Sequence, residues 1–346
     1  MEKIRLGRTG MMVTKLGFGG IPIQRLTEED AVDVVKRCMD LGINFIDTAN
    51  GYSTSEERIG KAIKGKRDQV ILATKSHNRT TDGIAGDIEL SLERLGVDSI
   101  DLFQFHQVFD QEGLDKVLAT DGPMSVVEGF QKQGKIKHIG ITSHSLDTAI
   151  LAVKTDRFAT MQFPFNFITN EPADELLGLC KKHDVGFIVM KPLGGGMLLN
   201  ASICFKFLRQ YPDIVPIPGI ETISEIEEIA SVYEGPIELT AKEKVEMQRL
   251  RDELGTRFCR RCGYCQPCTE DIAISTVMIA ESFGKRLPPG RFFSDGMAGV
   301  IMKARDCSDC GDCEDRCPYD LPIREEIAAR ADWYEEEKRK YDAGRN

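Results

Sequence analysis

The sequence predicts a (β/α)8 barrel preceded by a hairpin and followed by a smaller, mainly helical domain. Eight short apolar runs alternate with eight stretches of helical periodicity, the pattern of parallel strands joined by right-handed crossovers. Three of the runs end on a titratable side chain, namely Asp47, Lys75 and His106. Barrels carry functional groups at the carboxyl ends of their strands. These strand ends and the number of units together favour a closed barrel over an open sheet.

The expected elements follow one another regularly along the chain. Met1 to Thr14 alternates polar and apolar residues around Gly7 and Gly10, which predicts a short hairpin. Thr27, followed by three acidic residues, is typical of a helix N-cap. The expected strand and helix pairs are 13–19 with 28–41, 44–49 with 55–64, 70–75 with 83–95, 100–106 with 123–133, 137–142 with 146–154, 159–163 with 172–183, 187–192 with 201–210, and 214–218 with 223–232.

Length and charge limit the domain organisation and the partners. The 346 residues can hold one barrel of about 250 residues and a second domain, and we expect a division into 1–255 and 256–346. A capping box of Thr240 and Glu243 begins a helix that is either the last barrel helix or a linker. The net charge of −10 argues against nucleic-acid or anionic-membrane partners. No signal peptide and no apolar run of about 18 residues stands out, so we expect a cytoplasmic protein.

Four residues at or just past strand ends form a candidate catalytic group: Asp47, Tyr52, Lys75 and His106. A phenol has a pKa of about 10, and a neighbouring ammonium lowers it, so that the tyrosine becomes a usable general acid. Asp47 would keep Lys75 charged and aimed at Tyr52, and His106 could donate to a carbonyl oxygen. Each residue alone also has a structural interpretation, as a cap, an ion-pair partner, a core histidine or rim packing. Their shared position on successive strands favours the catalytic interpretation.

These residues belong to a longer series of motifs that resembles the aldo-keto reductase family, specifically members with a C-terminal ferredoxin-like extension. The resemblance covers most of residues 3–325 and implies a (β/α)8 barrel that uses NAD(P)H to reduce a small aldehyde or ketone. The family's catalytic tetrad corresponds to Asp47, Tyr52, Lys75 and His106 without a departure. The motifs that carry the resemblance are Gly42 to Tyr52, Ser55 to Gly60, Ala73 to Lys75, Leu92 to Gly96, Asp101-Leu102, Gly134 to Gly140, Gln162 with Asn166, Lys191 to Gly194, and Ile217 to Gly219.

The same resemblance implies where a nicotinamide cofactor would bind. Ser143 and Gln162 match positions that hold the nicotinamide amide, with Asn166 beside them. The glycines of the loop after the first strand make it tight and open to a ligand, and three later glycines allow backbone N–H groups to approach phosphate oxygens. Alternatively, these glycines only turn the chain. The remaining expected cofactor residues are Gly19, Gly20, Lys191, Pro192, Leu193, Gly194, Gly196, Pro218, Gly219, Glu225 and Glu228.

The eighth βα loop departs from the family pattern. Gly219 and Glu225 stand where many members place a lysine and an arginine that grip the 2′-phosphate of NADPH, and Ile229 replaces a usual asparagine. A carboxylate repels a 2′-phosphate but can accept from a ribose 2′-hydroxyl. The sequence therefore predicts that NADH is favoured over NADPH, or that nicotinamide binding is weak.

Eight cysteines near the C-terminus occur in two motifs with spacings typical of iron–sulfur proteins. The second motif ends in Cys-x3-Cys-Pro, as in bacterial ferredoxins, where the fourth cysteine ligates the other cluster. We expect one [4Fe–4S] cluster on Cys259, Cys262, Cys265 and Cys317, and another on Cys268, Cys307, Cys310 and Cys313. The long helical stretch between the motifs is typical of a helical ferredoxin.

Other interpretations of these cysteines remain open. The first motif has two residues, not three, before its last cysteine, and Thr269 follows where proline is common, so a single cluster on the second motif is an alternative. Four-cysteine sites also bind zinc, although zinc sites usually pair two knuckles across a longer loop. Cys38, Cys180 and Cys204 fall within helical patterns and are expected to be buried apolar residues.

Three functions are compatible with these features. The first is a carbonyl reductase whose clusters exchange electrons with a redox partner protein or stabilise the fold. The second is an iron–sulfur electron-transfer protein that uses the barrel as a docking scaffold. The third, a redox or iron sensor, is least favoured because no nucleic-acid-binding pattern is present.

Overall fold

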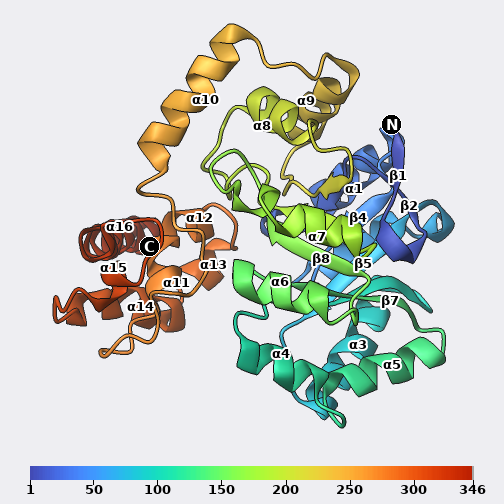
Figure 1. The fold of residues 1–346 in the computed structure, drawn as a ribbon, viewed down its shortest axis with the longest axis horizontal. Coiled ribbons are helices and arrows are strands. Elements are labelled where there is room, and N and C mark those ends of the chain that lie inside the picture. Colours follow the sequence, from blue (N-terminus) through green and yellow to red (C-terminus); the bar gives the residue numbers. More distant parts are fainter. Residues whose placement is uncertain (345–346) are drawn as a thin grey trace. The chain divides into compact units, whose positions relative to one another are not determined.

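The computed structural model describes residues 1–344, which divide into two compact units (Figure 1). The first unit is Met1–Leu239 and contains the barrel, and the second begins at Thr240 and contains the cysteine motifs. Helix α10 (Ala241–Leu254) therefore groups with the second unit, whereas the sequence had suggested a division after residue 255. Among the described residues, no helix is both long and apolar enough to cross a membrane.

Eight parallel strands in sequential order form the predicted sheet. Each pairs in parallel with its neighbours, as expected when helical crossovers join the strands. The strands are β3 (Phe18–Gly19), β4 (Phe45–Asp47), β5 (Ile71–Ser76), β6 (Ile100–Phe105), β7 (Ile136–Thr142), β8 (Thr160–Pro164), β9 (Gly186–Met190) and β10 (Ile214–Pro216).

Hydrogen bonds between the first and last strands bring the sheet edges together. The Gly17 amide donates to the Pro216 carbonyl at 2.8 Å, and the Gly19 amide donates to the Pro218 carbonyl at 2.8 Å. Gly19 and Gly219 form a parallel bridge just past the end of β10. The predicted barrel is therefore confirmed, with glycines at its closing seam.

The helices of the first unit follow the strands, with two differences from the sequence prediction. Helix α4 (Gln111–Leu118) was not predicted; the side chain of Asp110 caps it by accepting from the Gly113 amide. The expected helix 172–183 is shorter, since the turn that contains Pro172 precedes it. The other helices are α1 (Glu28–Asp40), α2 (Ser55–Ala62), α3 (Thr81–Leu95), α5 (Pro123–Lys132), α6 (Leu146–Lys154), α7 (Leu176–Lys182), α8 (Ala201–Leu208) and α9 (Ile223–Glu234).

The predicted N-terminal hairpin seals the amino-terminal end of the barrel. Strands β1 (Lys3–Arg5) and β2 (Met12–Thr14) are antiparallel, and Val13 pairs with Ile4 rather than beginning the first barrel strand. The buried side chains of Leu6 and Val13 cluster with Phe45 and other residues at the starts of barrel strands. The interior is therefore apolar at this end, which leaves the carboxyl ends of the strands for polar side chains.

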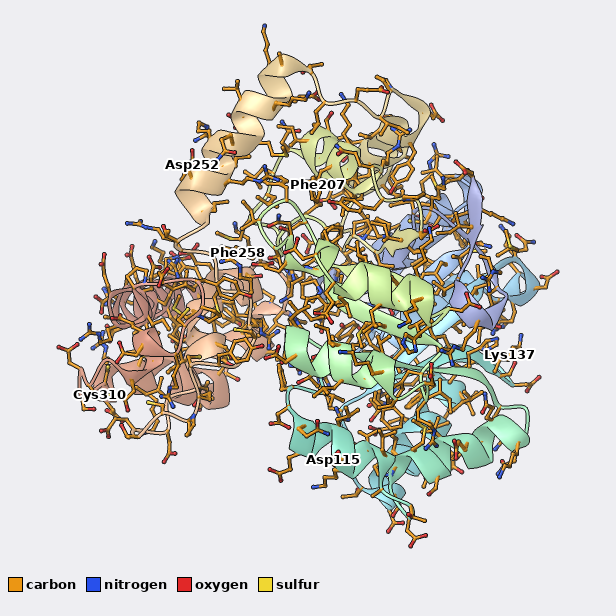
Figure 2. All side chains as sticks on the ribbon, viewed as in Figure 1. Asp115, Lys137, Phe207, Asp252, Phe258 and Cys310 are labelled. Carbon is orange, nitrogen blue, oxygen red and sulfur yellow. The ribbon has the colours of Figure 1, made fainter. Side chains whose placement is uncertain are left out.

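The second unit is helical and has a core of its own. Ile274, Val277 and Ile327 are among its buried residues, and the Tyr334 hydroxyl donates to the Phe292 carbonyl at 2.9 Å. Cys310 lies at the surface of this unit (Figure 2). After α10, its helices are α11 (Ile274–Met278), α12 (Ala280–Gly284), α13 (Pro289–Phe292), α14 (Asp295–Met302), α15 (Asp312–Asp315) and α16 (Ile323–Ala343).

Candidate active site and cysteine pockets

Asp47 and Lys75 form a buried ion pair at the carboxyl ends of β4 and β5. Lys75 Nζ lies 2.5 Å from Asp47 Oδ1 and 2.5 Å from the carbonyl oxygen of Thr48. The two side chains are only 3% and 1% exposed. Asp47 is paired with Ala73 in the sheet, and Lys75 lies two residues further on, so both side chains point to the same face.

Tyr52 and His106 lie beside this pair. Lys75 Nζ is 5.2 Å from the centre of the Tyr52 ring. The Tyr52 and His106 rings meet edge to face with their centres 5.8 Å apart. His106 is buried directly after β6, and Tyr52 is half-buried in the loop after β4. The structure thus brings together all four residues of the predicted catalytic group.

Two further residues of this site were not expected from the sequence. Gln104 Nε2, on β6, donates to Asp47 Oδ2 at 3.0 Å past the intervening strand β5. The exposed His77 stacks on His106 at a ring-centre distance of 3.8 Å. The available signal for Gln104 was an amide within the otherwise apolar run 102–105. His77 carried no distinguishing signal, because it lies in a loop of polar residues.

The electrostatic environment of Asp47 depends on its hydrogen-bond donors. Burial raises the pKa of the Asp47 carboxyl, while the charge and hydrogen bond of Lys75 and the side chains of Gln104 and Gln162 lower it. A carboxylate at the barrel centre would be costly without such partners. The donors therefore offset part of the cost of keeping this carboxylate ionised.

The three expected nicotinamide-binding residues differ in what they already contact. The Ser143 hydroxyl donates to the Val108 carbonyl at 2.6 Å. The Asn166 side chain bonds to the Lys191 carbonyl and to two amides of its own turn, so its polar atoms are engaged with the backbone. Gln162 Oε1 is buried and accepts no hydrogen bond from the described residues. It is the one of the three with an open acceptor for a ligand amide.

The glycine-rich segment after β9 forms a tight turn. Lys191 has a φ of 55°, and Gly194, Gly195 and Gly196 have φ values of 54°, 79° and 87°. The amides of Gly194 and Gly196 donate within the turn, to the carbonyls of Lys191 and Leu193. Pro192 and Leu193 complete this turn, and a methyl group on Gly196 would meet no atom within 4 Å. A neighbouring group could therefore approach the backbone at Gly196.

The glycines near the barrel seam are explained by chain packing. A Cβ on Gly19 would lie 2.7 Å from the Ile217 carbonyl oxygen and 2.8 Å from that of Pro218. A Cβ on Gly20 would lie 2.8 Å from Ser55 Oγ, and one on Gly219 would lie 2.7 Å from Pro22 Cγ. Close packing therefore favours glycine at these three positions, and at Gly19 the close neighbours are backbone atoms across the seam.

The two acidic residues of α9 also differ from each other. Glu225 Oε2 accepts from the amides of Glu221 and Thr222 at 2.7 and 3.0 Å, so this carboxylate completes a capping box. Glu228 is exposed on the next turn, and Ile229 is buried. Glu225 is thus held in place by its own helix, while Glu228 projects toward solvent.

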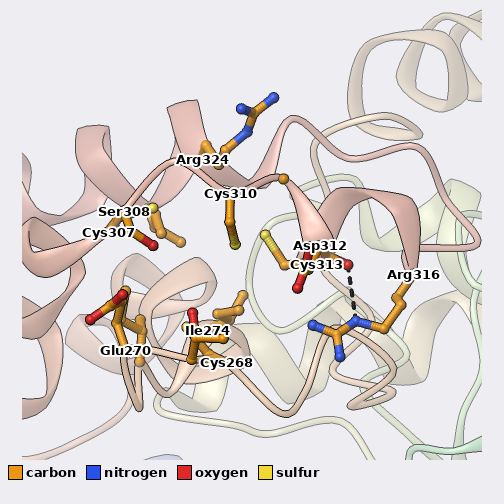
Figure 3. Close-up of a pocket in the computed structure, with 14 residues that line it drawn as sticks. Cys268, Glu270, Ile274, Cys307, Ser308, Cys310, Asp312, Cys313, Arg316 and Arg324 are labelled. Carbon is orange, nitrogen blue, oxygen red and sulfur yellow. Dashed lines mark hydrogen bonds between the residues drawn. The ribbon is translucent and has the colours of Figure 1, made fainter.

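The cysteines divide between two pockets, which we name the Cys259 pocket and the Cys310 pocket. Four of the residues that line the Cys259 pocket are Cys259, Cys262, Cys265 and Cys317. Four of the residues that line the Cys310 pocket are Cys268, Cys307, Cys310 and Cys313 (Figure 3). These are the two groups of four that the spacing predicted.

The thiols of each pocket are close enough to influence one another. Burial, together with the neighbouring Cys259 and Cys262, raises the pKa of Cys265 to about 12. Burial likewise raises the pKa of Cys262, with Cys259 and Cys317 adding to the effect. Within residues 1–344, however, no three His, Cys, Asp or Glu side chains are grouped as a single metal ion would require. In the described residues, the thiols of a pocket therefore do not converge on the position of one metal ion.

The first part of the chain matches the Aldo/keto reductase family over residues 15–203. Among curated proteins, it is 29% identical over 218 residues to the uncharacterized oxidoreductase YqkF of Bacillus subtilis, with 59% of this chain and 68% of that protein covered. It is 30% identical to aldo-keto reductase YhdN of the same organism, with 57% and 64% covered. Probable aldo-keto reductase 1 of Glycine max is 28% identical, with 57% and 60% covered. The chain thus matches about two thirds or less of the length of these relatives.

Solved structures share the fold. The holo form of aldo-keto reductase AKR11C1 from Bacillus halodurans has a TM-score of 0.63 and 24% identity, with 72% of this chain and 96% of that chain covered. An aldo/keto reductase from Klebsiella pneumoniae in complex with NADP and acetate has a TM-score of 0.60 and 23% identity, with 72% and 95% covered.

Proposed function

Since the chain belongs to the Aldo/keto reductase family, we propose that it reduces an aldehyde or ketone with NAD(P)H and uses Tyr52 as the general acid. The observation that carries this proposal is the position of Lys75. Its ammonium is buried, is fixed by Asp47 and Thr48, and lies 5.2 Å from the Tyr52 ring centre. A cation placed in this way favours the phenolate and so makes the phenol a stronger acid.

Each residue of the group has a role in moving the proton. In the proposed reaction NAD(P)H supplies the hydride to the carbonyl carbon. Tyr52 donates its hydroxyl proton to the carbonyl oxygen, and Lys75 stabilises the phenolate that remains. Asp47 holds Lys75 in position. His106 donates to the carbonyl oxygen of the substrate and orients it. Hydride and proton together convert the carbonyl to an alcohol, so no further reactant is required.

The residues present fit a nicotinamide cofactor. The buried, open Gln162 Oε1 can accept from the carboxamide nitrogen, because a buried acceptor without a donor is costly. The backbone at Gly196 is open on the side where a Cβ would project, which suits the approach of a phosphate. Ser143, Asn166 and Lys191 support this region from neighbouring strands. The Klebsiella pneumoniae relative was solved with NADP, which supports a nicotinamide cofactor of some kind.

Within this proposal, NADH is the preferred cofactor. Neither Gly219 nor Glu225 supplies a cation for a 2′-phosphate, and Gly219 packs against Pro22 too closely to carry a longer side chain. The carboxylates of Glu225 and Glu228 on α9 would repel such a phosphate. A ribose 2′-hydroxyl could instead donate to one of them.

The C-terminal unit is proposed to hold two [4Fe–4S] clusters. Each pocket is lined by four thiols, and their spacing along the chain follows the ferredoxin pattern, which favours a cubane over a single zinc ion. Such clusters exchange single electrons. We assign them to electron exchange with a redox partner protein, and we place the protein in the cytosol, where thiols stay reduced.

An electron-transfer protein that uses the barrel only as a scaffold is the second candidate. The observation that favours it is Glu225, whose carboxylate is already used in the helix cap. The buried Asp47–Lys75 pair argues against it, since a scaffold has no need of a buried charge pair beside a tyrosine.

Replacing Tyr52 with Phe separates the two candidates. The reductase proposal predicts that kcat/KM for carbonyl reduction falls by about 10²- to 10⁴-fold, the usual contribution of general acid catalysis. Iron and sulfide content and reduction of the clusters by dithionite should not change, because Tyr52 lies in the other unit. Carbonyl reduction that survives the substitution would contradict the role given to Tyr52, and no reduction by the unsubstituted protein across a broad carbonyl screen would favour the scaffold candidate.

A further inference from the structure

The two cysteine pockets differ in the charges that line them. Arg260 is the charged residue among those lining the Cys259 pocket. Its guanidinium lies 3.9 Å from the ring centre of Tyr319, which lines the same pocket. It also donates to the carbonyls of Gly255 and Phe258 at 3.1 and 3.2 Å, so it is fixed between the two cysteine motifs. This pocket therefore carries a positive charge at a defined position.

The Cys310 pocket has an acidic surround. Glu270, Asp312, Arg316 and Arg324 line it. Arg324 is in turn held by two carboxylates, Glu314 at 2.7 Å and Asp309 at 2.9 Å. The lining residues carry two carboxylates and two guanidinium groups, and the two carboxylates that hold Arg324 make the surround negative. Arg316 donates to the carbonyl of Asp312 and lies at the edge of the pocket (Figure 3).

Access to solvent also differs. Cys310 is the one exposed cysteine of the eight, and Ser308, Asp312 and Arg316 beside it are exposed as well. In the Cys259 pocket, three cysteines are half-buried, Cys265 is buried, and Arg260 is half-buried. A partner protein would therefore reach the Cys310 pocket more easily.

The two pockets adjoin each other, since Ile274 lines both of them. Clusters held in the two pockets would therefore be neighbours within this unit.

Building on the iron–sulfur assignment above, we propose that the Cys310 pocket is the port at which electrons enter and leave, and that Arg260 makes the cluster of the Cys259 pocket the one on which an electron settles. Reduction of a [4Fe–4S] cluster adds one electron and one negative charge, with no proton or leaving group. A low-potential one-electron donor supplies that electron. A fixed guanidinium stabilises the added charge, and nearby carboxylates oppose it, so Arg260 raises the reduction potential of its own cluster.

Solvent has the opposite effect on the difference between the two reduction potentials. Water stabilises the more negative reduced state, and so raises the potential, at the exposed Cys310 pocket. The test must therefore change charge without changing exposure. Arg260→Gln does so in the Cys259 pocket, and Arg316→Gln is the matched change in the Cys310 pocket. Arg260→Lys keeps the charge while losing the planar group that lies against Tyr319.

The experiment is an anaerobic redox titration of the full-length protein with dithionite, followed by electron paramagnetic resonance. The unsubstituted protein should show two midpoints. Arg260→Gln should lower the higher midpoint by about 59 mV or more, which is a tenfold change in the ratio of reduced to oxidised cluster for one electron. It should leave the lower midpoint in place, while Arg316→Gln should move only the lower one. Arg260→Lys should stay close to the unsubstituted protein.

Three results would overturn the proposal. The first is a pair of equal midpoints, the second is an Arg260→Gln shift in the lower midpoint, and the third is no shift at all. If Arg260→Gln lost iron, the shift caused by Arg316→Gln would still show which midpoint belongs to the Cys310 pocket. Failure of the underlying iron–sulfur assignment would be recognised separately, since the unsubstituted protein would then contain fewer than two clusters by iron and sulfide analysis.

Discussion

Gln104 Nε2 on β6 lies 3.0 Å from Asp47 Oδ2 on β4. The carboxylate is therefore held on one oxygen by Lys75 and on the other by the Gln104 amide. Both oxygens of this buried group are therefore occupied by donors. Because Asp47 in turn fixes Lys75, Gln104 acts on the catalytic group through one intermediate residue. It is a positioning residue, and its effect should be visible in how activity depends on pH.

Replacing Gln104 with Leu should reduce carbonyl reduction by about 10- to 100-fold, since a hydrogen bond to a charged group contributes about 1.5–3 kcal/mol. Loss of this donor raises the pKa of Asp47 further, because the hydrogen bond stabilises the ionised form. Asp47 must be ionised to hold Lys75, so the acidic limb of the kcat/KM profile should move to higher pH. Measurement of that profile for both proteins checks the shift.

Gln162→Leu serves as the comparison for Gln104→Leu. It removes a second donor to Asp47 and also the open acceptor Oε1. We expect it to raise the KM for the cofactor as well as to lower kcat. If Gln104→Leu raised the cofactor KM equally, Gln104 would be acting on the cofactor and not on Asp47.

Lys75→Met should impair stability as well as activity. It leaves the buried Asp47 carboxyl without its cation, and breaking a buried pair in this way costs about 3–5 kcal/mol. With Lys75 gone, the Asp47 pKa rises further above its unfolded value. The folded variant then binds more protons than the unfolded chain, so its stability should fall as pH rises above about 4. Urea unfolding at several pH values measures this trend.

The double variant Asp47→Asn with Lys75→Met is the control for the single one. It contains no buried charge at this position, so most of the lost stability and all of the added pH dependence should disappear. Activity should stay low in both variants. A double variant as unstable and as pH-dependent as Lys75→Met would show that the charge of Asp47 is not the cause.

The grouping of Asp47, Lys75 and His106 could be predicted from the sequence, because each lies at or beside the end of a strand and parallel strands bring those ends to one edge. Tyr52 follows in the loop after β4. Gln104 could not be predicted in the same way. Its role depends on the register of β6 against β5, in which Gln104 is paired with Lys75, and a strand pattern does not reveal register.

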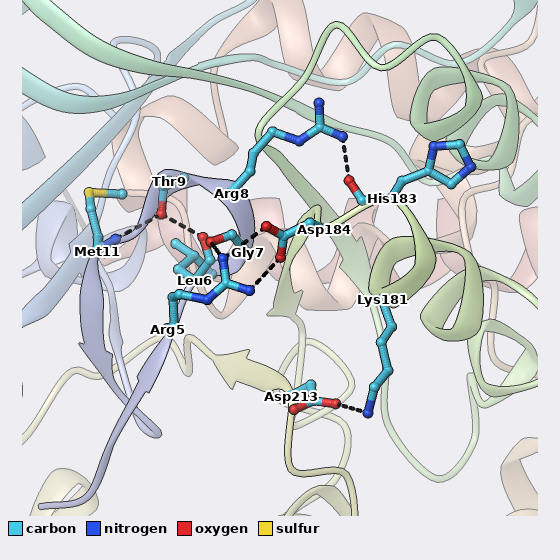
Figure 4. A network of polar contacts seen from close by, with 10 residues as sticks. All are labelled: Arg5, Leu6, Gly7, Arg8, Thr9, Met11, Lys181, His183, Asp184 and Asp213. Atoms are coloured by element: carbon cyan, nitrogen blue, oxygen red, sulfur yellow. Dashed lines mark hydrogen bonds and ion pairs between the residues drawn. The ribbon is translucent and has the colours of Figure 1, made fainter.

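Contacts between distant segments of the chain could not be predicted from the sequence either. The hairpin was predicted, but not the ion pair that anchors it, in which Arg5 bonds to Asp184 at 2.7 and 2.8 Å across 179 positions (Figure 4). The glycines at the barrel seam illustrate a second limit. Gly19 and Gly219 stay predicted cofactor residues, and the structure adds that a Cβ at either position would meet neighbouring chain atoms. A glycine in a loop does not reveal which neighbour comes close.

Cofactor preference can be tested on α9. Glu228 is exposed, so Glu228→Lys changes one surface charge without disturbing the cap made by Glu225. The unsubstituted protein should have a higher kcat/KM with NADH than with NADPH. The substitution should shift the ratio of these two values toward NADPH by about tenfold, which is the effect expected from one charge-assisted contact with the 2′-phosphate. Glu234→Lys, at the other end of the same helix, is the matched charge change and should have little effect. A clear preference of the unsubstituted protein for NADPH would contradict the interpretation of this loop.

The number of clusters can be tested at Cys268. Replacement of Cys268 with Ser should remove about half of the iron and sulfide, because this thiol lines the Cys310 pocket with the three cysteines of the second motif. Cys180→Ser is the control, since this thiol is buried in α7 of the first unit, lines neither pocket, and has a pKa that burial raises to about 12. An unchanged iron content in Cys268→Ser, with one cluster in the unsubstituted protein, would support the one-cluster alternative.

Gly140 in β7 provides a test of the barrel interior. A Cβ at this position would lie 2.1 Å from Thr160 Oγ1 and 3.2 Å from Gln104 Cγ. Thr160 is fully buried and β-branched, so its side chain has little freedom to move aside. Gly140→Ala should therefore destabilise the barrel by about 1–3 kcal/mol, the range for overpacked cores, measured by urea unfolding.

Gly129→Ala in α5, where nothing lies within 4 Å, should instead be neutral or stabilise by about 0.5–1 kcal/mol. Adding Thr160→Ala to Gly140→Ala removes the clashing oxygen and should restore part of the loss. If it restored none, contact with Thr160 would not be the cause, and the displacement of Gln104 from Asp47 would be the remaining explanation.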